Sequence, residues 1–220
     1  MKATHMRPRP ILSVLAGFVL FAPAWGLAAP PFDPAATVTA FVAGLGRMTR
    51  DTSLSASDRE REFAGILSED CDLPRIAGYT LGSYAATASI AERQQFDGLF
   101  QRWVTHIFAD RLGGFDAASF SVKSVATANN GAIVSSEIAD GIHPIRIEWR
   151  VSADDGSRIV DVAMEGISIA AVEREEMGAV LRRNGGTVAD LNRALAVRLA
   201  SDDGATPPSA VAAATTASAH

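Results

Sequence analysis

Residues 89–112 read SIAERQQFDGLFQRWVTHIFADRL and carry the strongest structural pattern in the chain. Ser89 followed by Glu92 has the form of a capping box, which satisfies backbone donors at the start of a helix. Gly113-Gly114 is expected to end this helix, which is roughly 35 Å long on that reading. The apolar residues recur every three or four positions and so form one broad helical face: Phe96, Leu99, Phe100, Trp103, Val104, Ile107, Phe108 and Leu112.

After this helix, apolar and polar residues alternate, which is typical of strands. Turn sequences such as Asp140-Gly141 separate the alternating segments, and short turns join antiparallel neighbours. The pattern therefore predicts an antiparallel meander with one packed face. Its four strands are expected near residues 119–127, 131–139, 143–152 and 157–167.

The third and fourth strands indicate which residues face the core. The third strand has one apolar face and one charged face. The apolar face carries Ile145, Ile147, Trp149 and Val151, and the charged face carries Arg146, Glu148 and Arg150. In the fourth strand a period of two places on the packed face Val160, Val162 and Met164, and on the opposite face Ile159, Asp161, Ala163 and Glu165.

Further helices flank these elements on both sides. Asp33, Ser57 (in a capping box with Glu60) and Thr187 are the expected N-caps. Helices before and after a contiguous antiparallel sheet predict an α+β fold. A long helix on a curved sheet can form a cone, which is either filled by side chains or open to an apolar ligand. The flanking helices are expected at 34–48, 57–69, 74–84, 171–183 and 187–199.

Both ends of the chain differ in composition from this domain. Lys2, Arg7 and Arg9 precede an apolar stretch of 12 residues, which is too short to span a bilayer. With small residues after it, this segment predicts a secretory signal peptide at 1–28, and hence a soluble periplasmic protein. The remainder is then one domain at 32–199, followed by an Ala/Ser/Thr/Pro-rich tail at 200–220 that is expected to be disordered.

Charge and cysteine content narrow the functional classes. The signal peptide holds three of the 20 basic residues and no acidic one, so 17 basic and 25 acidic residues remain, a net charge of −8. Nucleic-acid binding is disfavoured by that sign. The single cysteine, Cys71, cannot form an intramolecular disulfide and is interpreted as a small buried apolar residue.

Reactive groups do not form a recognisable constellation in the sequence. His106 is interpreted as a rim or packing residue and His143 as a solvated one, with no metal-ligand spacing between them. Asp161 and Glu165 could be a carboxylate pair, but they are expected on the face of the fourth strand that is solvated or salt-bridged, opposite Val160, Val162 and Met164. Neither a cofactor nor a metal is expected.

Two blocks of the sequence resemble the MlaC-type family of periplasmic lipid-binding proteins, the auxiliary components of ABC transporters that are also linked to toluene tolerance. The first is CDLPRIAGYTLGSY (71–84) with ERQQFDGLFQRWVTHIFADRL (92–112). The second is IHPIRIEWRVSADDGSRIVDVAMEGISIAAVEREEMGAVLRRNGG (142–186). The likeness covers roughly residues 35–198. Cys71 and Ser83 depart from the family pattern, where Phe and Arg are expected, and this leaves open the hopanoid-associated HpnM branch.

The resemblance implies a fold and a set of partners. The fold is an NTF2-like-derived cone whose apolar cavity takes the acyl chains of a phospholipid or a hopanoid-like lipid. The implied partners are an inner-membrane MCE-domain ABC transporter and an outer-membrane lipoprotein–porin complex. The chain is expected to be a monomer that carries lipid between these two complexes. By this transport it would contribute to the lipid asymmetry of the outer membrane.

Three hypotheses follow. The leading one is a lipid carrier, because sheltering hydrocarbon from water requires a cavity and no catalytic group. The second is an NTF2-like isomerase or hydrolase, which needs an acid or base such as Asp161 or Glu165 inside the cavity. The third is a structural domain with a filled cavity. For the carrier, the candidate lipid-binding residues are Ile76, Tyr79, Leu99, Trp103, Phe108, Ile145, Ile147, Trp149, Val162 and Met164.

Overall fold

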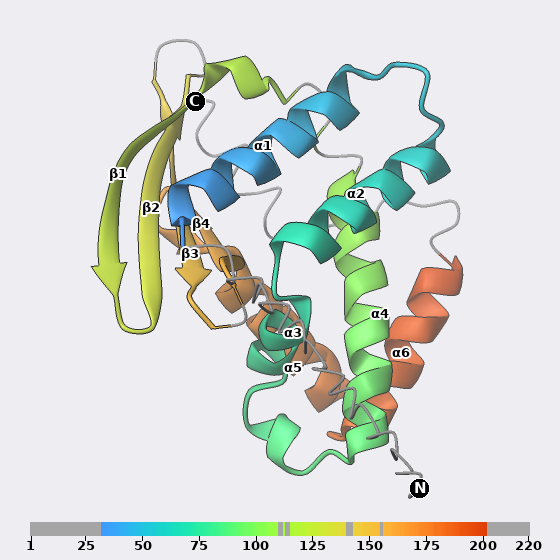
Figure 1. Ribbon diagram of the computed structural model, residues 1–220. Helices are drawn as coiled ribbons and strands as arrows, with labels where there is room; N and C mark the ends of the chain where they lie inside the picture. Colours follow the sequence, from blue (N-terminus) through green and yellow to red (C-terminus); the bar gives the residue numbers. More distant parts are fainter. Residues whose placement is uncertain (1–31, 110–111, 113–114, 140–142, 155, 202–220) are drawn as a thin grey trace, which may run out of the picture.

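The computed structural model describes residues 32–109, 112, 115–139, 143–154 and 156–201 (Figure 1). The described chain contains six α-helices and one antiparallel sheet, so the predicted α+β class is confirmed. The helices are α1 (Pro34–Arg50), α2 (Ala56–Asp70), α3 (Leu73–Leu81), α4 (Ile90–Ala109), α5 (Ile169–Arg183) and α6 (Val188–Ser201). Two 3-10 helices, η1 (Gly82–Ala86) and η2 (Ala117–Ser119), connect them to their neighbours.

The sheet is a meander in which every neighbouring pair of strands is antiparallel. The four predicted strands are present, and a two-residue fifth strand is added at the edge. In chain order they are β1 (Phe120–Ala128), β2 (Gly131–Ile138), β3 (Ile145–Ser152), β4 (Arg158–Met164) and β5 (Ile167–Ser168). In Figure 1 the sheet lies on the left and α4 stands upright on the right, with α1 crossing between them.

Side-chain caps start the helices at the positions shown by local sequence signals. The capping box of α4 is confirmed: the backbone N–H of Ser89 donates to Glu92 Oε2 at 2.7 Å, and the N–H of Glu92 donates to Ser89 Oγ at 3.2 Å. Asp33 caps α1 through Ala36, as predicted.

Two further helix starts differ in how well their capping signals predicted them. Thr187 caps α6 through Asp190, as predicted. The predicted start of α2 at Ser57 is wrong, because Ser55 Oγ accepts the N–H of Asp58 at 3.1 Å and the helix begins at Ala56. Two serines with acids three residues later compete there, and the earlier one forms the cap.

A β-bulge in β4 changes which of its residues face the core. Ile159 pairs with Val151 and Asp161 pairs with Arg150, so Val160 is an extra residue on its strand. A bulge of this kind reverses the alternation of side chains on one side of it. The prediction that Val160 shares the packed face while Ile159 does not is therefore wrong: Ile159 is 1% exposed and belongs to the core.

Buried side chains form two clusters that meet at α4. The sheet-side cluster joins α1, α2 and the start of α3 to β2, β3 and β4; it comprises Val38, Phe41, Val42, Leu45, Met48, Phe63, Leu67, Cys71, Leu73, Ala109, Val134, Ile147, Trp149, Val151 and Ile159. The helical cluster joins α3, α4, α5 and α6; it comprises Ala77, Leu81, Phe96, Leu99, Phe100, Trp103, Ile107, Met177, Leu181, Val188, Leu191, Leu195 and Leu199.

A backbone contact fastens the α2–α3 junction to the sheet. The N–H of Asp72 donates to the carbonyl of Ile159 at 2.9 Å, beside a parallel bridge between Cys71 and Ile159. Arg158 adds hydrogen bonds from Nη1 to the carbonyls of Ser68, at 2.8 Å, and Cys71, at 3.3 Å. These bonds fix the distance between the sheet edge and α2.

The predicted signal peptide at 1–28 lies outside the described residues. The last helix continues to Ser201, two residues past its predicted end, and the remainder of the predicted tail, 202–220, also lies outside them. In the described part of the chain, no helix combines the length and the apolar character needed to cross a membrane.

Candidate functional site

An apolar cavity of about 240 Å³ lies between the sheet and the helices. Its wall is formed by side chains from α1 to α5, from the segment after α4 and from strands β2, β3 and β4. The lining residues come from α1 and α2 (Phe41, Leu45, Phe63, Leu67), from the α2–α3 junction and α3 (Cys71, Leu73, Ile76), from α4 and the segment after it (Phe100, Val104, Phe108, Leu112, Phe115), from the sheet (Ile138, Ile147, Trp149, Ile159, Asp161, Val162, Met164) and from α5 (Ile169, Ala170, Glu173).

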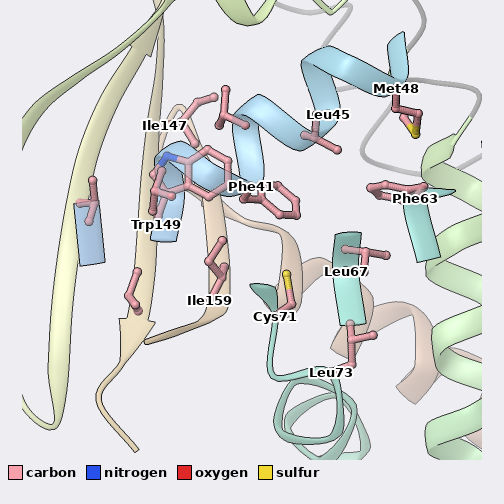
Figure 2. Close-up of a cluster of buried hydrophobic side chains, with 14 of the residues drawn as sticks. Phe41, Leu45, Met48, Phe63, Leu67, Cys71, Leu73, Ile147, Trp149 and Ile159 are labelled. Atoms are coloured by element: carbon pink, nitrogen blue, oxygen red, sulfur yellow. The ribbon is translucent and has the colours of Figure 1, made fainter. Parts of the chain in front are cut away.

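Trp149 and Phe41 form the aromatic part of the sheet-side wall. Their rings meet edge to face, with centroids 5.6 Å apart, and Figure 2 shows Phe41 of α1 beside the indole on β3. The polar edge of the indole is satisfied, because Trp149 Nε1 donates to Ser136 Oγ at 2.8 Å. Ser136 is itself buried and donates to the carbonyl of Ile147 at 3.3 Å. The indole is thereby held in place without a polar group facing the cavity.

The long apolar face of α4 divides between the cavity and the helical cluster. Phe100, Val104 and Phe108 line the cavity at intervals of four residues, which places them on one line along the helix. Leu99, Trp103 and Ile107 lie one position earlier and pack in the helical cluster. A single broad stripe in the sequence thus serves two packing surfaces.

Six of the ten sequence-predicted site residues line the cavity. They are Ile76, Phe108, Ile147, Trp149, Val162 and Met164. The structure does not bring the other four to it. Leu99 and Trp103 belong to the helical cluster, Ile145 packs against the sheet-side cluster, and Tyr79 is 46% exposed, with the guanidinium of Arg174 5.1 Å from its ring centre.

Sequence reasoning missed the contributions of α1 and α2. Phe41 and Leu45 are one helical turn apart, as are Phe63 and Leu67, so the period of four was visible in the sequence. What the sequence did not show was that these faces meet the sheet. Ile159 was also missed, because the bulge at Val160 moves it to the packed face.

Cys71 is part of the apolar wall, in agreement with its interpretation as a buried apolar residue. It is 6% exposed, and the chain holds no second cysteine. Burial raises the pKa of the Cys71 thiol to about 12, with a smaller contribution from the neighbouring carboxylate of Asp70. At neutral pH the side chain is therefore an uncharged thiol, and it presents apolar surface to the cavity.

Asp161 is held by hydrogen bonds at the start of α5. Its carboxylate accepts from Ser168 Oγ at 2.7 Å and from the N–H of Ala170 at 3.2 Å, and Arg150 Nε lies 3.8 Å away. Only 12% of the side chain is exposed. Although Asp161 borders the cavity, its oxygens face the donors of the helix start, so its contacts are structural.

Glu165 does not form a carboxylate pair with Asp161. It lies in the turn after β4 rather than on the strand, with a left-handed φ of 48°. Its carboxylate accepts the backbone N–H of Arg146 at 2.6 Å, and this bond is the main reason that the pKa of Glu165 is lowered. The predicted placement of both acids on a solvated strand face is wrong for each of them. Asp161 borders the cavity and is largely buried, and Glu165 lies beyond the strand, which ends at Met164.

One further carboxylate, Glu173 on α5, borders the cavity. It is 1% exposed, and its Oε2 accepts a hydrogen bond of 3.1 Å from Trp103 Nε1. The guanidinium of Arg198 on α6 lies over the same indole, 4.7 Å from the Trp103 ring centre. This network ties α4, α5 and α6 together behind the cavity wall.

The two described histidines, His106 and His143, do not line the cavity. His106 Nδ1 lies 3.0 Å from Glu60 Oε1, so this residue links α4 to α2, and His143 is exposed. Within the described ranges, no group of three or more His, Cys, Asp or Glu side chains is arranged to hold a metal ion.

Comparison with known proteins places the fold. A family model described as "MlaC protein" matches residues 42–196. Among solved structures, the chain is similar to a phospholipid-binding protein from Ralstonia solanacearum in complex with a phospholipid. That likeness has a TM-score of 0.67 and 19% sequence identity, and it covers 77% of this chain and 98% of the other. No curated protein sequence matches the chain.

Proposed function

The chain belongs to the MlaC protein family, and from this premise we propose that it is a lipid carrier that holds hydrocarbon in the cavity between the sheet and the helices. The cargo is a phospholipid or a related membrane lipid, such as a hopanoid-like one. The observation that carries the proposal is the cavity itself, because aromatic and aliphatic side chains from five helices and three strands line it.

The physical task explains why such a wall is useful. Transferring hydrocarbon from water into an apolar site is favourable by about 0.8 kcal/mol per methylene, so two exposed C16 chains represent roughly 20 kcal/mol or more. A carrier offsets that cost by replacing water with side chains such as Phe41, Phe108 and Trp149. The solved relative with the same fold is a phospholipid-binding protein in complex with a phospholipid, which supports this class of cargo.

The chemistry of the bordering carboxylates favours a carrier over the enzyme alternative. An isomerase or hydrolase would need an acid or base available inside the cavity. Asp161 is engaged by Ser168 and the backbone of Ala170, and Glu173 accepts the indole N–H of Trp103. Glu165 is in a turn, with a lowered pKa. All three acids have structural hydrogen bonds.

The proposed setting follows from the sequence pattern and the family. Residues 1–28 act as a cleaved signal peptide, and residues 32–201 form the lipid-binding domain. The chain works in the periplasm as a monomer. It moves lipid between an inner-membrane MCE-domain ABC transporter and an outer-membrane lipoprotein–porin complex. The charge pattern of residues 1–28 and the resemblance of residues 35–198 support this setting.

Native mass spectrometry of the protein purified from the periplasm tests the function. We expect about one lipid per chain, which solvent extraction would then release for identification. The proposal fails if the protein is lipid-free as isolated and also takes up no lipid during incubation with vesicles of phosphatidylethanolamine and phosphatidylglycerol. Cleavage after Ala28 can be read from the intact mass in the same experiment.

A further inference from the structure

The lining of the cavity differs in exposure between its two ends. One end, which we call the floor, is formed by α1, the α2–α3 junction and the start of β4, and all of its lining residues are buried: Phe41, Leu67, Cys71, Leu73 and Ile159. At the other end, which we call the mouth, α4, β2 and β4 end and α5 begins. Its partly exposed lining residues are Val104, Phe108, Leu112, Phe115, Ile138, Met164 and Ile169. Three other partly exposed lining residues, Ile76, Asp161 and Val162, belong to α3 and the middle of β4.

The pairing of β3 with β4 orders the sheet side of the wall by depth. From mouth to floor, the successive pairs are Ile147 with Met164, Trp149 with Val162, and Val151 with Ile159. A strand advances by about 3.3 Å per residue, so each of these pairs lies roughly 7 Å or more beyond the one before it. The sheet therefore provides a continuous apolar wall between the two ends.

Hydrogen bonds hold the floor in place. The N–H of Asp72 donates to the carbonyl of Ile159 at 2.9 Å, and Arg158 donates to the carbonyls of Ser68 and Cys71. Moving the floor away from β4 would break these bonds, and buried backbone groups are costly to leave unpaired. Because the backbone is fastened, the size of the side chains decides how deep the cavity is.

Cys71 has the smallest side chain of the floor. Figure 2 shows it between Ile159 of β4 and Leu67 of α2. The two neighbours have larger aliphatic side chains, so the surface of the floor is lowest at the thiol. An apolar chain that enters from the mouth can therefore reach farthest at Cys71.

Building on the proposed function, we propose that the acyl chains of a bound phospholipid end at this floor, and that the floor side chains set the longest acyl chain that the site accepts. The methyl end of an acyl chain suits a buried apolar floor. The head group stays at the mouth, because a charged group is strongly disfavoured in an apolar interior.

Competition between phospholipids that differ only in acyl length measures this limit. Delipidated protein would be incubated with vesicles that hold equal amounts of phosphatidylglycerols with two C12, C14, C16 or C18 chains. Native mass spectrometry then gives the amount of each bound lipid. Short lipids leave vesicles more easily, so the ratio of bound C14 to bound C18 lipid is always compared with that of the native chain.

Two floor variants should shift this ratio in opposite directions. Cys71→Leu adds two heavy atoms to the floor, so about two methylenes lose their place and the C14-to-C18 ratio should rise about tenfold. Leu67→Ala removes three carbons from the floor and should lower the ratio. Folded variants that both keep the native ratio would overturn the proposal.

Two further variants control for position. Ile169→Phe enlarges a side chain at the mouth, so it should lower the total amount of bound lipid without a comparable shift in the ratio. A shift as large as that of Cys71→Leu would contradict a limit set at the floor. Ile107→Val alters the helical cluster instead of the cavity and should match the native chain in both quantities.

Photocrosslinking locates the methyl ends in the native chain, so this test does not depend on the folding of a variant. The probe is a phosphatidylcholine with a diazirine at the last carbon of one acyl chain. After irradiation, mass spectrometry of peptides should find the modification within residues 67–73 or at Ile159. The same group on the choline should modify residues near Met164 and Ile169. The reverse pattern would overturn the proposal.

The outcomes separate this inference from the function on which it rests. If the floor variants bind phospholipid with the acyl distribution of the native chain, the carrier function stands and the limit set by the floor is wrong. If the native chain is lipid-free as isolated and takes up no lipid from vesicles, both proposals are wrong.

Discussion

The indole N–H of Trp149 on β3 donates a 2.8 Å hydrogen bond to the Oγ of Ser136 on β2. Both side chains are buried, at 4% and 2% exposure. The pair places a polar contact inside an otherwise apolar layer and holds the largest ring of the cavity wall in one orientation. Because a buried N–H without an acceptor is costly, the cavity wall depends on this small hydroxyl.

Ser136→Ala is expected to lower the free energy of unfolding by about 1–3 kcal/mol, because it leaves the Trp149 N–H without its acceptor. Adding Trp149→Phe removes the donor as well, so the double variant should lose less than the sum of the two single changes. Urea denaturation of the four proteins gives this double-mutant cycle. Strictly additive losses would show that the hydrogen bond contributes nothing to stability.

Stability at alkaline pH reports on the burial of Cys71. Its pKa is raised to about 12 in the folded protein, against about 9 for an unfolded thiol. Below pH 9 both states keep the proton. As the pH rises from 9 toward 12, the unfolded state loses its proton first, so the folded state is progressively destabilised. We expect this contribution to reach about 1 kcal/mol at pH 10.

Cys71→Ala isolates that contribution from other titrating groups. The variant is expected to be less stable than the native chain at pH 8, because a small void is left in the wall. The difference between the two proteins should shrink by about 1 kcal/mol by pH 10. Equal differences at the two pH values would mean that the thiol is accessible to water in the folded state.

The helical part of the fold was predictable because its signals are local. The capping box of Ser89 and Glu92 and the spacing from Phe96 onward define α4 without knowledge of any other element. The meander was predictable for the same reason, since short turns force consecutive strands to pair. The MlaC resemblance then linked these elements to a family, which the match over residues 42–196 shows.

The composition of the site was only partly predictable, because it depends on how distant elements meet. The stripe on α4 contains both Phe108, which lines the cavity, and Trp103, which bonds to Glu173 in another layer. Periodicity alone places Phe108 and Trp103 on the same apolar face of the helix and does not tell which of them lines a cavity. The bulge at Val160 has no strong sequence signal, and it exchanged the roles of Val160 and Ile159.

Asp161 and Glu165 are expected to affect stability rather than lipid loading. Asp161→Ala removes the acceptor at the start of α5 and should lower the free energy of unfolding by about 1–2 kcal/mol. Asp161→Asn keeps a neutral acceptor and should cost less, and Glu165→Gln should leave lipid occupancy unchanged. Thermal melting and lipid extraction measure the two effects. Loss of a measurable turnover in Asp161→Asn or Glu165→Gln would instead support an enzyme.

If lipid hydrocarbon occupies the cavity against β4, the variants Val162→Asp and Val160→Asp should differ in the lipid that they bind. Val162 lines the cavity, whereas Val160 is the extra residue of the bulge two positions away. Only the first change places a carboxylate where the lipid chain should lie, and a carboxylate without a partner is strongly disfavoured there.

Lipid occupancy of both variants would be measured by native mass spectrometry, with far-UV circular dichroism and thermal melting to establish that they fold. We expect Val162→Asp to lose most of its bound lipid and Val160→Asp to retain about one lipid per chain. Folded Val162→Asp protein with full lipid occupancy, or an equal loss of lipid in both variants, would contradict the placement of lipid against β4.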